Sequence, residues 1–258
     1  MNRIAKLTVF GFTLAAIVIA ADNPFVGTWK LNPQKSSFTG DTMTYTAGDG
    51  GEMKYSGGGL SYTFKPDGTE RAGLLGEMVA WKQLDDHTWE VAHKTKGKVT
   101  ATETLKLSDD GKTLDDTFKG TRPNGESFED KVVYERTSGD SGILGTWKST
   151  KIQIGSPERL ELKAYDGDGI TFYSPEEKFT ASAKFDGKQY PAIGPTVPAG
   201  ATGALRRVDP LSFELTESYK GKPFWKGTYT VSEDKQTLTV KGGMIGANEP
   251  MTAVYDRQ

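Results

Sequence analysis

The chain has 258 residues, with 32 Lys and Arg against 34 Asp and Glu, and no cysteine. The lack of cysteine excludes disulfides, thiolate metal sites and a cysteine nucleophile. The slightly acidic balance gives no electrostatic footprint for nucleic acid or an anionic membrane surface, so neither partner is expected.

The N-terminus has the composition of a cleavable signal peptide. Basic Arg3 and Lys6 precede a largely apolar run over residues 7–19, and Val18-Ile19-Ala20 fits a small-residue cleavage pattern. The run is shorter than the ~20 residues that span a bilayer. We therefore predict a signal peptide over residues 1–21, no membrane insertion, and an exported protein that is periplasmic or secreted.

The mature chain repeats itself. Gly27-Thr28-Trp29-Lys30 returns as Gly145-Thr146-Trp147-Lys148, and each copy heads a segment that closes on Tyr-acid-Arg, at 134–136 and 255–257. From opening Trp to closing Arg is 136 − 29 = 107 residues in one copy and 257 − 147 = 110 in the other. This period predicts two similar domains, at 22–139 and 140–258, joined by a flexible linker at 137–142.

Between these anchors, apolar and polar residues alternate, as in Leu60-Ser61-Tyr62-Thr63-Phe64. Asp-Gly and Asn-Gly pairs separate the alternating runs and are typical of hairpin turns. We predict about eight to ten short strands per repeat. The fold class is all-β, with two tandem antiparallel up-and-down β-barrels, because closure removes exposed sheet edges. The Pro- and Gly-rich segment 190–205 is expected to hold the extra residues of the second repeat.

The Gly-x-Trp opening with an Arg on the last strand resembles the lipocalin-like (calycin) pattern. The start Phe25 to Pro33 is similar to uncharacterised exported bacterial lipocalin-like domains. The resemblance implies that each Trp plugs one barrel end under a basic side chain of the last strand, which pairs Trp29 with Arg136 and Trp147 with Arg257. Neither repeat has the Thr-Asp-Tyr motif of typical lipocalins.

The two histidines are His87, in a turn, and His93, on the strand face of Trp89 and Val91. If Lys96-Gly97-Lys98 forms a three-residue connection, His93 lies opposite Ala101 and diagonal to Glu103. A shift of 124 carries His93 to Glu217, so both barrels place a titratable group at one interior level. These groups are either internal polar pairs or polar anchors of a cavity.

No catalytic constellation is found, so an enzyme is not expected. One interior histidine does not make a triad, a haem site or a metal site, no Gly-x-Ser-x-Gly elbow occurs, and Asp166-Gly167-Asp168-Gly169 lacks the closing Glu of a calcium loop. We expect no metal and no cofactor.

The leading hypothesis is a binding protein for a small apolar or amphipathic molecule. The rival is an interaction protein with filled barrels, acting through its loops or the groove between barrels, for an unknown protein partner. The smaller Ala101, against Trp225, predicts the larger cavity in the first barrel. Ligand identity and oligomeric state stay open. The candidate ligand-binding residues are Tyr62, Phe64, Trp89, His93, Glu103, Phe213, Glu217, Trp225 and Tyr229.

Overall fold

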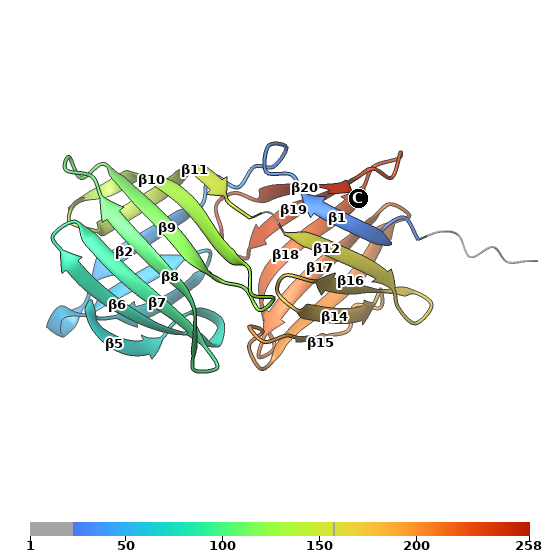
Figure 1. Ribbon diagram of the computed structural model, residues 1–258, viewed down its shortest axis with the longest axis horizontal. Coiled ribbons are helices and arrows are strands. Elements are labelled where there is room, and N and C mark those ends of the chain that lie inside the picture. The colour runs from blue at the N-terminus through green and yellow to red at the C-terminus, as the bar shows by residue number, and fades with distance from the viewer. Residues whose placement is uncertain (1–22, 157) are drawn as a thin grey trace, which may run out of the picture.

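The computed structural model describes residues 23–156 and 158–258, so the predicted signal peptide lies outside the described residues. The described chain forms two antiparallel β-barrels that lie side by side (Figure 1). Each sheet has ten strands; one closes completely and the other nearly so. The predicted all-β fold with two barrels is confirmed.

The nearly closed sheet, called the first barrel here, has its seam between β4 and β5. Its strands are β2 (Thr42–Ala47), β3 (Met53–Gly57), β4 (Leu60–Phe64), β5 (Asp67–Ala72), β6 (Met78–Asp85), β7 (Thr88–Thr95), β8 (Lys98–Leu107), β9 (Thr113–Thr121), β10 (Ser127–Ser141) and β11 (Leu144–Ile154). Two short 3-10 turns, η1 (Asp49–Gly51) and η2 (Leu74–Gly76), interrupt its loops.

The closed sheet is called the second barrel. Its strands are β1 (Gly27–Leu31), β12 (Arg159–Ala164), β13 (Gly169–Ser174), β14 (Phe179–Lys184), β15 (Tyr190–Ile193), β16 (Ala201–Asp209), β17 (Ser212–Tyr219), β18 (Lys222–Val231), β19 (Thr237–Met244) and β20 (Met251–Arg257).

The two repeats exchange their opening strands. β1, from the first repeat, pairs with β12 and β20, with Thr28 opposite Glu161. β11, from the second repeat, pairs with β10 and β2, with Thr146 opposite Thr44. In Figure 1 the blue β1 accordingly lies among the yellow-to-red strands of the second barrel. Repeats and barrels therefore do not coincide: 27–31 belongs to the second barrel and 144–154 to the first.

The segment predicted as a flexible linker is instead the end of a hairpin. Residues 137–141 belong to β10, and the chain turns at Gly142 and Ile143 directly into β11. This tight connection holds β11 beside β10, within the first barrel. The chain crosses between barrels at two other places, after β1 and after β11.

Each barrel end is closed by an arginine over a tryptophan. The guanidinium carbon of Arg257 lies 4.1 Å from the Trp29 ring centroid, and that of Arg136 lies 4.1 Å from the Trp147 ring. The predicted plug role is consistent with both indoles being fully buried. The predicted pairing of Trp29 with Arg136 and Trp147 with Arg257 is wrong, because the near-identical opening strands are exchanged.

Hydrogen bonds hold both the Arg257 guanidinium and the Trp29 indole in place. Its two terminal nitrogens donate to the carbonyls of Val26 and Pro24, each at 2.8 Å, while the Trp29 indole donates to the Phe25 carbonyl at 2.9 Å. A side chain at Gly27 would collide with the guanidinium, which explains the glycine of the Gly-x-Trp motif.

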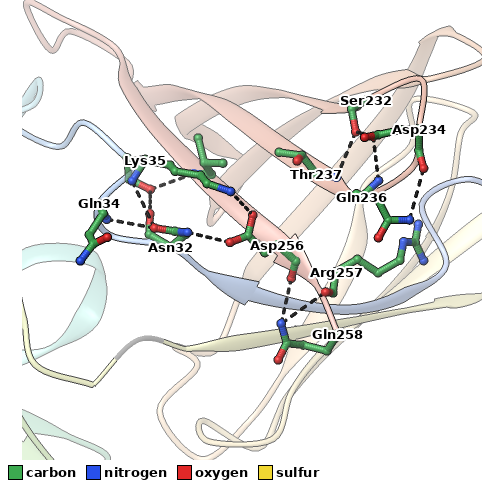
Figure 2. A network of polar contacts seen from close by, with 12 residues as sticks. Asn32, Gln34, Lys35, Ser232, Asp234, Gln236, Thr237, Asp256, Arg257 and Gln258 are labelled. Carbon is green, nitrogen blue, oxygen red and sulfur yellow. Dashed lines mark hydrogen bonds and ion pairs between the residues drawn. The ribbon is translucent and has the colours of Figure 1, made fainter.

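The segment leaving β1 is anchored to the last strand as well. Asn32 donates from Nδ2 to Asp256 at 2.6 Å, and the Lys35 ammonium lies 2.8 Å from the same carboxylate (Figure 2). These contacts join residues more than 200 positions apart, so the N-terminal segment is an integral part of the second barrel.

We predict that Trp29→Ala unfolds the second barrel selectively. Truncating a fully buried Trp costs about 3–5 kcal/mol, and here the loss falls on the barrel that β1 closes. Hydrogen-exchange mass spectrometry should show lost protection in 159–257 and retained protection in 42–154, and Trp147→Ala should give the reciprocal pattern. Loss of protection confined to the first barrel in Trp29→Ala would contradict the strand exchange.

Candidate functional site

The second barrel contains a cavity of about 410 Å³, within the volume range of small-molecule sites. Strands on opposite walls of the barrel and the segment after β15 supply its lining. Most of the lining side chains are apolar or aromatic. They include Leu160, Phe172, Phe179, Ala181, Ala183, Tyr190, Ala192, Val197, Pro198, Leu205, Leu215, Phe224, Tyr229 and Tyr255.

Stacked aromatic rings fill the end of this barrel that Arg257 and Trp29 close. Phe25 meets Phe213 edge-on with centroids 4.8 Å apart, and Phe213 stacks on Tyr229, also at 4.8 Å. Tyr229 in turn borders the cavity, which continues from there toward the segment 194–200. The stack of Phe213 on Tyr229 thus lies between Phe25 and the cavity.

One carboxyl group faces this pocket from the barrel wall. Glu217 on β17 lies opposite Gly203 on β16 and Trp225 on β18, and both Glu217 and Gly203 line the cavity. Gly203 itself adds no side chain there, and Leu215 lies closest to the position that a side chain would take. Burial raises the pKa of Glu217.

The first barrel contributes to the mouth of the cavity. Arg122, in the turn between β9 and β10, donates to the Ser156 carbonyl at 2.8 Å and lies 3.6 Å from Glu158 and 3.5 Å from Glu177. Only 5% of the Arg122 side chain is exposed. Glu158 and Glu177 both border the cavity. Beside them, Arg159 pairs with Glu176 at 2.8 Å. This ionic group joins the two barrels at the entrance.

The interior of the first barrel is filled by aromatic side chains. Phe64 stacks on Trp81 with centroids 4.1 Å apart, and Tyr45 meets both rings edge-on. The Trp81 indole donates to the Tyr62 hydroxyl at 3.1 Å, and Trp89 is buried nearby. These contacts occupy the space that a ligand would need.

The first barrel also holds an internal polar cluster around His93. Its Nδ1 lies 3.2 Å from Glu77 and its Nε2 lies 3.0 Å from Glu103. Burial alone would lower the pKa of His93, but the hydrogen bonds and charges of Glu103 and Glu77 outweigh it and raise the pKa to about 9. Burial and neighbouring Glu103 raise the pKa of Asp116 as well.

The predicted pairing of His93 with Ala101 is confirmed, but the turn that produces it differs from the expected one. Lys96 and Gly97 form a two-residue turn with φ of 52° and 78°, and a bulge at Thr100 then places His93 opposite Ala101. In the second barrel Glu217 lies opposite Trp225, so His93 and Glu217 occupy equivalent positions.

The larger cavity was expected in the first barrel, whereas the barrel cavity that the structure shows lies in the second. One reason is the covering loop. In the first barrel the short segment 73–77 carries Glu77 onto His93. Its counterpart 194–200 is longer and borders the cavity instead. The other reason is Trp225, whose ring lies over Gly227 rather than across the barrel.

The candidate residues fall into three groups. Glu217 and Tyr229 line the cavity, Phe213 and Trp225 pack behind its wall, and the first-barrel candidates belong to the filled core or the His93 cluster. Sequence reasoning missed Arg122, Glu158 and Glu177, because strand alternation does not report contacts between domains. The Pro- and Gly-rich insertion was the available signal for the cavity mouth.

No protein-family model matches the chain, and no curated protein matches it. Over residues 23–156 and 158–258, no group of three or more acidic or histidine side chains is arranged to hold a metal ion. The same part of the chain contains no helix long and apolar enough to cross a membrane.

We predict that His93 stays protonated in the folded protein well above pH 7. The pKa of His93 is ordinarily 6.5 and is about 9 in the folded protein. At pH values between these two, the folded state binds one more proton at His93 than the unfolded state does. The stabilisation from His93, on the order of 2–3 kcal/mol, is therefore complete below pH 6.5 and lost as pH rises through 9. Asp116, which holds its proton in the folded state, changes stability in the same direction.

Histidine side-chain NMR measures this directly, since His87 and His93 are the two histidines of the chain. His87→Gln assigns the signals, and Glu103→Gln should lower the His93 midpoint by removing a negative charge beside the imidazole. A His93 midpoint below 6.5 would contradict the buried ion-pair cluster.

Proposed function

We propose that the protein is a non-catalytic binding protein for a small apolar or amphipathic molecule, held in the second barrel. The observation that carries this proposal is the cavity of about 410 Å³ with a mainly apolar lining and the Glu217 carboxyl on its wall. Few polar groups in an apolar pocket are typical of small-molecule sites.

The first barrel fits the alternative hypothesis, an interaction protein whose barrel is filled by its own side chains. We propose that it supports the mouth of the cavity in the second barrel. Its aromatic core leaves its side chains packed against one another, and Arg122 reaches from it to the cavity mouth. The ligand and the interaction hypotheses thus apply to different halves of one molecule.

Export and lipocalin likeness are part of the proposal. The basic and apolar N-terminal sequence supports secretion or a periplasmic location. The Gly-x-Trp strand, the arginine over its indole and the antiparallel barrels support a lipocalin-like assignment. Function is argued from the cavity, because one fold serves many functions.

We predict that n-octanol binds in the second barrel and that Ala181→Trp abolishes the binding. Ala181 lines the cavity, so an indole at that position takes up the ligand volume. Isothermal titration calorimetry should give saturable binding with a negative heat-capacity change, the signature of apolar burial. Thr180→Trp, on the neighbouring residue outside the lining set, is the matched control and should bind normally. Equal binding by wild type and Ala181→Trp would refute the assigned site.

A further inference from the structure

The surroundings of Glu217 differ from those of its first-barrel equivalent. Its first-barrel equivalent, His93, contacts Glu77 and Glu103. The positions that correspond to those two glutamates are Ala201 and Gly227, which offer neither charge nor hydrogen-bonding side chains. Among the described residues, no hydrogen bond or ion pair holds the Glu217 carboxyl, and burial is the sole cause of its raised pKa.

The neighbouring Trp225 occupies space in which a partner for the Glu217 carboxyl could otherwise lie. The Trp225 ring lies over Gly227, where a side chain would collide with it. Trp225 therefore takes the place that Glu103 has in the first barrel and removes the site's internal partner. On the other side, Gly203 lies opposite Glu217, and both residues line the cavity.

The remaining charges around the cavity are acidic or already paired. Glu158 and Glu177 border its mouth. Arg159, which also borders it, is held by Glu176, and Arg122 is held by the Ser156 carbonyl and the mouth glutamates. A negatively charged ligand would meet repulsion from these carboxylates, while a cation would be attracted.

The cavity has a polar end and an apolar end, which lie at different positions along the barrel axis. Phe213, at the start of β17, packs against Phe25, whereas Glu217 lies further along the strand, nearer the mouth. Phe172, Leu205 and Tyr229 surround the deeper part of the cavity. A ligand with one charged end and an apolar body fits this layout with its charged end at Glu217.

We infer that the cavity selects amphiphiles bearing a protonated amino group, with the ammonium bound to Glu217 and the apolar body toward Tyr229. This inference rests on the proposed binding function. A carboxylate without a partner in a mainly apolar cavity is costly, and a charge-assisted hydrogen bond from a ligand ammonium supplies a partner for it.

Three probes with the same chain test this inference: n-octylamine, n-octanol and n-octanoate, titrated calorimetrically into the full chain at pH 7. Octylamine should bind about tenfold more tightly than octanol, and octanoate more weakly than either. Glu217→Gln should weaken octylamine binding by about tenfold while leaving octanol binding within about twofold. Octanol binding by the variant also reports that its cavity is folded. Glu233→Gln, in an exposed turn of the same barrel, is the matched control.

Equal affinities for octylamine and octanol, unaffected by Glu217→Gln, would overturn amine selectivity and leave the apolar binding function standing. The tightest binding by octanoate would also overturn it. If none of the three probes binds, the proposed function fails together with the inference.

Discussion

The contact between Arg257 and Trp29 joins the first strand of the chain to its last and closes one end of the second barrel. The guanidinium covers the indole and donates to the carbonyls of Val26 and Pro24, so it fixes the N-terminal strand to the last strand of the chain. Arg136 and Trp147 make the same contact in the first barrel. Since each tryptophan belongs to the opposite repeat, each barrel contains a strand from the other repeat.

This exchange has a consequence for the cavity. Two chain crossings and the shared strands keep the barrels adjacent, which places the β9–β10 turn of the first barrel at the mouth of the second. Arg122 can then pair with Glu158 and Glu177 without a flexible tether. The duplicated barrels have diverged inside this fixed frame: one interior is packed with aromatic rings, and the other retains a pocket.

Much of the framework could be predicted from the sequence. Alternation and turn residues predicted the antiparallel strands, and the repeat predicted that His93 and Glu217 share one interior level. The pairing of Trp29 with its arginine could not be predicted, because the two Gly-Thr-Trp-Lys strands fit either barrel equally well. The choice depends on connections, above all the tight turn at Gly142 that holds β11 next to β10. The place of the cavity also escaped prediction, because residue volumes at 101 and 225 do not reveal that the Trp225 ring lies against Gly227.

Cysteine cross-linking tests the strand exchange most directly, because the natural chain contains no cysteine. Thr28 lies opposite Glu161 in the exchanged barrel, and directly opposed antiparallel residues are within disulfide reach. Without exchange, Thr28 would take the place of Thr146 and lie opposite Thr44. The account predicts an intramolecular disulfide in oxidised monomer carrying Thr28→Cys and Glu161→Cys, and none with Thr28→Cys and Thr44→Cys. A disulfide in the second variant and none in the first would contradict it.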